Sequence, residues 1–212
     1  VGATSPKALQ DAVLSHRADL GIALDGDGDR IQMVDAEGNL YDGDQLLYAM
    51  VRSRARRGKV DGVVGTLMTN LALEHALGKL GIPFARAAVG DRYVVEMLLE
   101  KGWLYGGENS GHLLCLDRHS TGDGIIAGLQ VLAAMQEAGV GLKSLLAELK
   151  LYPQRLINVP VARGVSWRDH PQVISAQKDV EDELAGRGRV LLRASGTEPL
   201  LRVMVEGEDA EL

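Results

Sequence analysis

Three aspartates alternate with glycines in residues 25–30, Asp-Gly-Asp-Gly-Asp-Arg. Glycines permit the tight turns that let carboxylates at alternate positions point inward on one cation. Mg²⁺ takes such oxygen ligands in near-octahedral geometry, whereas without a cation the three carboxylates would repel one another. The segment therefore predicts a magnesium site made by Asp25, Asp27 and Asp29.

Two other phosphate- or metal-binding patterns do not fit this segment. A calcium EF-hand needs glycine at its sixth position and glutamate at its twelfth, where this chain has Arg30 and Ala36. The dinucleotide fingerprint needs a third glycine at position 31, which is Ile31. A solvated acidic turn between two strands remains the alternative interpretation.

A second polar segment, residues 106–112, reads Gly-Gly-Glu-Asn-Ser-Gly-His. Glu108 offers an acceptor and Ser110 a donor, which suit the hydroxyl or amino groups of a sugar. The order Gly-x-x-Ser-Gly is not that of a nucleophile elbow. The segment predicts a ligand loop, with a plain connecting loop as the alternative.

A third segment, residues 193–199, reads Arg-Ala-Ser-Gly-Thr-Glu-Pro, and Arg202 follows it. The hydroxyls of Ser195 and Thr197, the backbone N–H of Gly196 and the guanidinium of Arg193 can together hold a phosphate dianion. Arginine suits this task because its planar fork meets phosphate oxygens in pairs. A hairpin loop without a ligand remains the alternative.

Apolar runs and helix boundaries predict the elements that carry these segments. Strands at 20–24 and 31–34 flank the aspartates, and helices and strands then alternate, which favours an α/β fold with a mixed sheet covered by helices. The expected helices are 44–57 with Asp44 as its cap, 70–80, 91–101, 122–138 and 142–149, and the expected strands are 60–65, 82–88 and 112–116.

A smaller α+β unit is expected after Pro153, which breaks the helical pattern. Its expected elements are a half-buried strand at 155–161, a helix at 171–184 and strands at 189–193 and 200–206. We therefore expect three parts along the chain: 1–39, 40–150 and 151–212.

Composition restricts the class of protein. Among the 212 residues 46% are hydrophobic, enough for a core, but no apolar run approaches the roughly 18 residues of a membrane-spanning helix. A net charge of -6 argues against nucleic acid as a partner, and the single Cys115 favours a reducing compartment, the cytoplasm. The start at Val1, without Met or a signal sequence, is what an internal fragment would show.

Taken in this order, the three segments resemble those of the α-D-phosphohexomutase superfamily. That family has a metal loop Asp-Gly-Asp-Gly-Asp-Arg, a sugar loop Gly-Glu-x-Ser-Gly/Ala-His and a phosphate loop in its last domain, so the resemblance spans nearly the whole chain. Asn109, the Ser-Gly-Thr-Glu-Pro sequence of 195–199 and the Gly-Asp-Arg of 90–92 resemble the phosphoglucosamine mutase branch. In phosphomannomutase/phosphoglucomutase relatives, Met more often follows the loop Glu and Asn more often replaces Gly196.

The resemblance implies a four-domain enzyme. Residues 1–39 would be the end of domain 2 with the metal loop, 40–150 the sugar-recognition domain 3, and 151–212 an incomplete phosphate-binding domain 4. Mg²⁺ would bind the three aspartates, and Arg30 would be catalytic, beside the phosphoryl group in transfer.

The resemblance also implies the ligand contacts. Glu108 and Ser110 would read the sugar ring. The phosphate that is not transferred would be held by Arg193, Ser195, Gly196, Thr197 and Arg202.

The implied reaction interconverts glucosamine 6-phosphate and glucosamine 1-phosphate through an enzyme phosphoserine and a bisphosphate intermediate, and it would feed UDP-N-acetylglucosamine and cell-wall precursor synthesis. The family's serine loop, of a Thr-Ala-Ser-His-Asn-Pro type, has no counterpart among these residues, so we expect the chain alone to be inactive and its missing N-terminal domains to be its partners. A homodimer is left open. A sister mutase acting on mannose or glucose phosphates and a non-catalytic sugar-phosphate-binding module are the alternatives.

Overall fold

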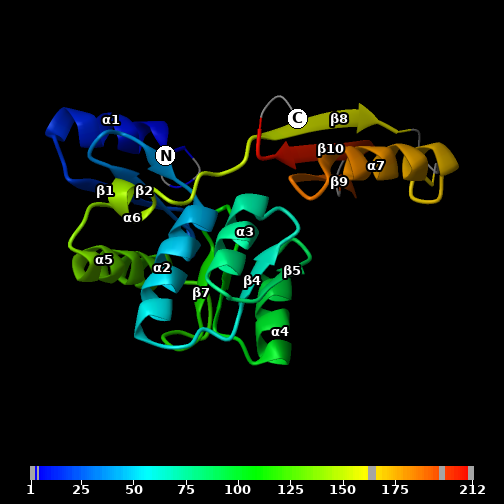
Figure 1. Ribbon diagram of the computed structural model, residues 1–212. Coiled ribbons are helices and arrows are strands. Elements are labelled where there is room, and N and C mark those ends of the chain that lie inside the picture. The colour runs from blue at the N-terminus through cyan, green and yellow to red at the C-terminus, as the bar shows by residue number, and fades with distance from the viewer. Residues whose placement is uncertain (1–2, 4, 162–165, 196–198, 210–212) are drawn as a thin grey trace. The chain divides into compact units, whose positions relative to one another are not determined.

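The computed structural model describes residues 3, 5–161, 166–195 and 199–209, and it divides into two compact units (Figure 1). The first unit is Val1–Lys150 and the second is Leu151–Leu212. Within the described residues, no helix is both long and apolar enough to cross a membrane.

An antiparallel sheet in the first unit carries the aspartate segment. Its strand order is β1 (Leu20–Leu24), β2 (Ile31–Asp35), β3 (Leu40–Tyr41), and the aspartates lie in the connection from β1 to β2. The helices α1 (Lys7–His16) and α5 (Gly124–Ala138) pack on its two faces (Figure 1). Helix α1 is absent from the sequence predictions, because it begins after Pro6 with no side chain that caps it.

The second sheet of this unit is mixed, with the order β5-β4-β6-β7. The strands β4 (Val63–Thr66), β5 (Phe84–Ala87) and β6 (Tyr105–Gly107) are parallel, and β7 (Leu113–Cys115) is antiparallel to β6. The covering helices are α2 (Gly43–Arg57), α3 (Leu71–Lys79) and α4 (Asp91–Lys101). The predicted α/β class is confirmed. Because parallel strands end at one edge, the connections after β4, β5 and β6 meet there.

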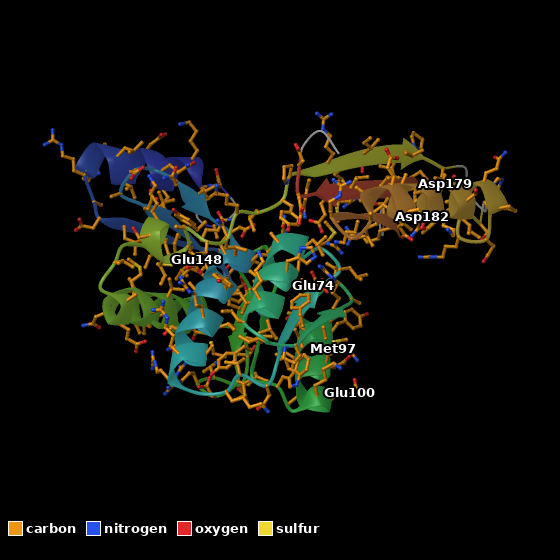
Figure 2. The ribbon with its side chains drawn as sticks, in the orientation of Figure 1. Glu74, Met97, Glu100, Glu148, Asp179 and Asp182 are labelled. Atoms are coloured by element: carbon orange, nitrogen blue, oxygen red, sulfur yellow. The ribbon has the colours of Figure 1, made fainter. Side chains whose placement is uncertain are left out.

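Apolar packing and ion pairs hold the helices of this unit to its strands. The side chains of Val64, Val94, Leu98 and Leu114 are fully buried between the sheet and α4. Near the surface, Glu74 of α3, which Figure 2 labels, accepts from Arg86 of β5 at 2.8 Å. Surface pairs of this kind contribute about 0–1 kcal/mol, so burial is the larger stabilising effect.

Helix α2 begins at Gly43, one residue before the predicted start, and its cap is Asp42 in place of Asp44. The Asp42 carboxylate accepts from the N–H of Gln45 at 3.1 Å, and the Gln45 side chain accepts from the N–H of Asp42 at 3.3 Å, a reciprocal capping box. The buried Asp44 carboxylate instead accepts from the N–H of Asn70 at 2.8 Å, which ties α2 to the start of α3.

The second unit is a three-stranded antiparallel sheet with one helix. Its strand order is β8 (Gln154–Pro160), β10 (Leu200–Gly207), β9 (Gly188–Ala194), and α7 (Pro171–Leu184) packs against β9. Every residue of β8 is exposed, so the prediction of a half-buried strand there is wrong. The helix predicted over 142–149 is also shorter, since α6 is Leu142–Leu145.

Gly43, the first residue of α2, makes a close backbone contact. Its N–H donates to the carbonyl of Asn109 at 3.0 Å, and a Cβ at this position would lie 2.0 Å from the carbonyl oxygen of Glu108. Only glycine allows this approach, which fixes the start of α2 against residues 108–111.

Asp35 at the end of β2 is a buried carboxylate with four donors. They are the N–H groups of Glu37 and Asn39, the Asn39 side-chain amide and the Tyr41 hydroxyl, at 2.9–3.0 Å. Burial alone would raise the pKa of Asp35, but these hydrogen bonds outweigh it and hold the pKa below its usual value.

The Gly43 contact predicts a large effect of one methyl group. We expect Gly43→Ala to lower the free energy of unfolding by about 1–3 kcal/mol, because the backbone at Glu108 must shift. The control is Gly78→Ala in α3, where a Cβ meets nothing within 4 Å, and where we expect a gain of up to about 1 kcal/mol. Urea denaturation measures both, and equal stability of the two variants would contradict the contact.

The hydrogen bonds of Asp35 predict a pH-dependent loss. Because its folded pKa is lowered, the stabilisation is present above the unfolded value of 3.8 and is lost as the pH falls through the folded pKa. We expect Asp35→Asn to cost about 1–3 kcal/mol at neutral pH, with a deficit that shrinks below pH 3.8.

Thermal unfolding followed from neutral pH to pH 3 tests this. Asp11→Asn on the exposed face of α1 is the control, expected to change stability by less than about 0.5 kcal/mol. A deficit for Asp35→Asn that is constant over the whole pH range would show that the carboxylate charge plays no part.

Candidate functional site

The three predicted metal ligands converge in the structure. One carboxylate oxygen each from Asp25, Asp27 and Asp29 lies within 4.8 Å of the others. The connection closes on itself, because the N–H of Arg30 donates to Oδ1 of Asp25 at 3.1 Å. Gly28 has a φ of 77°, a value that glycine adopts without strain. The local fold therefore brings the alternating carboxylates to one point.

The charges of this cluster are only partly balanced by the chain. Arg30 Nε lies 3.7 Å from Oδ2 of Asp25 and 3.9 Å from Oδ1 of Asp29. That Asp29 oxygen is buried and has no hydrogen-bond partner in the described part of the chain. Burial raises the pKa of Asp29, the His112 charge opposes this, and the carboxylates of Asp25 and Asp27 add to it. Clustered oxygen ligands with one unsatisfied buried atom fit a hard divalent cation such as Mg²⁺.

Glu108 lies in a tight turn between β6 and β7. Gly106 and Gly107, which we expected in the loop, belong to strand β6. The N–H of Gly111 donates to the carbonyl of Glu108 at 3.0 Å, and Gly111 has a φ of 99°. The Glu108 carboxylate accepts from the N–H of Gly90 at 3.0 Å. Glu108 is 9% exposed and Ser110 is exposed, so one side chain is held in place and the other faces solvent.

The turn and the aspartate segment are joined through their backbones. The N–H of Ile31 donates to the carbonyl of Gly111 at 3.1 Å, and Arg30 forms a β-bridge with His112. A Cβ at Gly111 would lie 2.1 Å from the carbonyl oxygen of Ile31, so the two segments meet without a side chain between them. The segments predicted to bind metal and sugar therefore lie in direct contact in the first unit.

His112 is a site residue to which the sequence assigned no role. Its Nε2 lies 3.6 Å from Oδ2 of Asp29, and its side chain is almost fully buried. A Cβ at Gly122 would lie 2.2 Å from that same Nε2, so the chain before α5 covers the ring. Its place at the end of the Glu-Asn-Ser-Gly-His segment was the available indication, but its contact with Asp29 depends on the β-bridge.

Two helices begin at this site. Gly90 caps α4 beside Glu108, and Asp123 caps α5 by accepting from the N–H groups of Ile125 and Ile126 at 2.8 and 2.9 Å. The first N–H of α5, that of Gly124, donates to the carbonyl of Gly28 at 2.9 Å. Helix N-termini carry a partial positive charge, which favours an anion close to the cluster of aspartates.

The predicted phosphate-binding residues lie in the second unit, apart from Gly196 and Thr197, which are outside the described residues. Arg193 on β9 lies directly opposite Arg202 on β10. Arg202 Nη2 lies 3.5 Å from the Ser195 hydroxyl, and its Nε is buried and has no hydrogen-bond partner among the residues that the structure describes. Two facing guanidinium groups with spare donors can bind an anion.

Comparison with known proteins agrees with this arrangement of segments. Residues 42–152 match the family model for "Phosphoglucomutase/phosphomannomutase, alpha/beta/alpha domain III", and residues 156–212 match the model for the C-terminal domain of the same family. The chain is 78% identical over 210 residues to the phosphoglucosamine mutase of Dechloromonas aromatica, covering 99% of this chain and 47% of that protein. The chain thus spans about half the length of the curated relatives it matches.

Solved structures show the same fold at lower sequence identity. A phosphoglucomutase/phosphomannomutase family protein from Burkholderia thailandensis has a TM-score of 0.75 at 21% identity, over 99% of this chain and 48% of that one. The Aspergillus fumigatus N-acetylphosphoglucosamine mutase, solved with GlcNAc-6P and magnesium, has a TM-score of 0.69 at 24% identity, over 90% of this chain and 49% of that one. Because residues 42–152 and 156–212 match two domain models of one family, the chain belongs to the phosphoglucomutase/phosphomannomutase family.

Proposed function

We propose that the chain forms the metal-, sugar- and distal phosphate-binding part of a phosphoglucosamine mutase, which interconverts glucosamine 6-phosphate and glucosamine 1-phosphate. The convergence of three carboxylates within 4.8 Å, joined through the backbone to the turn that holds Glu108, carries this proposal. Such an arrangement places a cation next to a group that recognises polar ligands. The 78% identity to a phosphoglucosamine mutase supports this choice of sugar.

Asp25, Asp27 and Asp29 would hold Mg²⁺, which when bound neutralises negative charge on a phosphoryl group in transfer. Arg30 would add its guanidinium beside that group, since it lies at the edge of the carboxylate cluster and is partly exposed. His112 would hold Asp29 from the buried side. In this proposal the chain contributes charged side chains that are already in position before the substrate binds.

Glu108 and Ser110 would bind the sugar. The bond from Gly90 fixes one oxygen of the Glu108 carboxylate and leaves the other as an acceptor. An ionised carboxylate accepts hydrogen bonds from the hydroxyl groups of a sugar and, more strongly, from an ammonium group. Glu108 is therefore the residue that we assign to recognition of the sugar.

Arg193, Ser195, Gly196, Thr197 and Arg202 would hold the phosphate that is not being transferred. Arginine and hydroxyl donors recognise the phosphate group and not the sugar attached to it. A single clamp can therefore hold the substrate by either of its ends, as a reaction through a bisphosphate requires.

The phosphoserine that donates and regains the phosphoryl group would come from another part of the same protein. In this proposal residues 1–39, 40–150 and 151–212 contribute to three successive domains. The product would supply UDP-N-acetylglucosamine and cell-wall precursor synthesis.

A second candidate function is that of a phosphomannomutase or phosphoglucomutase. The description of the matched family supports it. The two candidates share the metal site and the phosphate clamp, so they differ in the sugar that the Glu108 turn accepts.

The metal site predicts a loss of Mg²⁺ affinity in two variants. We expect Asp27→Asn and Asp29→Asn each to weaken binding of Mg²⁺ or Mn²⁺ by about tenfold or more, because one charged ligand is lost. Calorimetry with Mg²⁺ and electron paramagnetic resonance with Mn²⁺ measure this. Asp19→Asn, just before the opposite end of β1, is the matched control and should bind as the unaltered chain does. Equal affinities for all four proteins would refute the site.

Because the phosphoserine is proposed to lie outside these 212 residues, we predict that the chain binds the sugar phosphate but does not convert it. We expect no conversion of glucosamine 6-phosphate by the chain alone, and turnover when the same residues are part of the complete protein. Phosphate transfer to serine is monitored by phosphorus NMR. Activity of the chain alone would contradict the proposal that its nucleophile lies outside these residues. A higher kcat/KM of the complete protein for mannose or glucose phosphates would favour the second candidate.

A further inference from the structure

One face of the β8-β10-β9 sheet carries three cross-strand rows. Residues directly opposite in antiparallel strands project from the same face, with Cβ atoms about 4.5–5.5 Å apart. The register gives a first row of Gln154, Glu206 and Arg189, a second of Leu156, Met204 and Leu191, and a third of Asn158, Arg202 and Arg193. We call the first the paired row and the third the anion row.

The paired row shows how this sheet balances an arginine internally. Glu206 is 1% exposed and accepts from Nε of Arg189 and from the amide of Gln154, the latter at 2.6 Å. A buried carboxylate is stable there because both neighbouring strands supply donors to it. The charges of this row are satisfied without a ligand.

The anion row has the same cross-strand arrangement as the paired row, but none of its three residues carries a negative charge. Arg202 replaces the central carboxylate, so two guanidinium groups face each other, an arrangement that is destabilising in a sheet. Within the described residues neither Arg193 nor Arg202 makes an ion pair, and Nε of Arg202 is buried without a hydrogen-bond partner. An external anion is what this row lacks.

We propose that Asn158 completes the phosphate clamp, by donating its side-chain amide N–H to the phosphate oxygens held by Arg202 and Arg193. This deepens the proposed function and rests on it. Asn158 lies opposite Arg202 on the outer strand β8, just as Gln154 lies opposite Glu206. An amide is suited to the position because it adds a donor without adding a third positive charge.

Asn158 lies about 35 residues before the Arg193–Pro199 segment, so the clamp draws on all three strands of the sheet. The α7 helix does not compete for this face. Its apolar groove of about 430 Å³ is lined by Val190, Leu192, Leu201 and Val203, which alternate with the anion-row residues along β9 and β10 and so point to the opposite face.

The test compares phosphate binding by five forms of the 212-residue chain: unaltered, Arg202→Ala, Asn158→Ala, Asn158→Asp and Gln172→Glu. Inorganic phosphate is titrated without Mg²⁺, so that metal-bound phosphate does not contribute. NMR follows the arginine Nε–H and the asparagine side-chain amide resonances, and the Asn158 amide is assigned by its absence in the variants. Gln172→Glu on α7 is the charge-matched control for Asn158→Asp.

We expect phosphate to shift the Asn158 amide saturably, and Asn158→Ala to weaken binding about tenfold, the loss of one hydrogen bond to a charged group. Asn158→Asp would supply the carboxylate that the row lacks. We expect it to weaken binding further and to raise Tm, because it relieves the repulsion between the arginines. If Asn158 were merely structural, its amide resonance would show no saturable shift with phosphate and Asn158→Ala would leave the phosphate affinity unchanged. Gln172→Glu should bind as the unaltered chain does.

Two other results separate this inference from the function on which it rests. If Arg202→Ala abolishes binding while both Asn158 variants bind as the unaltered chain does, the role of Asn158 is wrong and the clamp stands. If phosphate shifts no arginine resonance and Arg202→Ala changes nothing, the clamp itself is wrong, and the assignment of Asn158 falls with it.

Discussion

Contact of backbone with backbone around residues 108–111 is the constraint on which the site of the first unit depends. Gly43 donates to Asn109, Ile31 donates to Gly111, and at Gly43 and Gly111 a Cβ would lie 2.0 and 2.1 Å from a carbonyl oxygen. Since no side chain fits between these segments, the turn, the start of α2 and the connection from β1 to β2 that carries the aspartates move together. The position of Glu108 relative to the aspartates is thereby set by packing that tolerates little change.

Unbalanced charge is the second theme of the molecule. The aspartate cluster has three carboxylates beside the partly exposed Arg30, and one Asp29 oxygen has no hydrogen bond within the described residues. The anion row has two arginines and no carboxylate, while the paired row on the same face is balanced internally. Uncompensated charge costs stability in a folded chain, so each excess supports the ligand of opposite sign that we propose there.

Much of the architecture follows from local sequence. The strands at 20–24 and 31–34 and the helices at 91–101 and 171–184 were predicted within a residue or two, because apolar periodicity and helix ends are local properties. Helix α1 and the β6 strand were missed, since one lacks a capping side chain and the other consists largely of glycine. Asp42 and not Asp44 caps α2. The Asp44 carboxylate instead accepts from the N–H of Asn70 at the start of α3, 26 residues further along the chain.

The sequence by itself determined that Asp25, Asp27 and Asp29 would converge, because ligands two residues apart in a glycine-rich turn need only the turn to meet. Tertiary structure alone decided the rest of the site. In the first unit, His112 contacts Asp29 through a β-bridge across some 80 residues, and Gly90 at the start of α4 orients Glu108. In the second unit, strand register places Asn158 opposite Arg202. Such contacts depend on pairing between distant strands, which no local pattern of residues encodes.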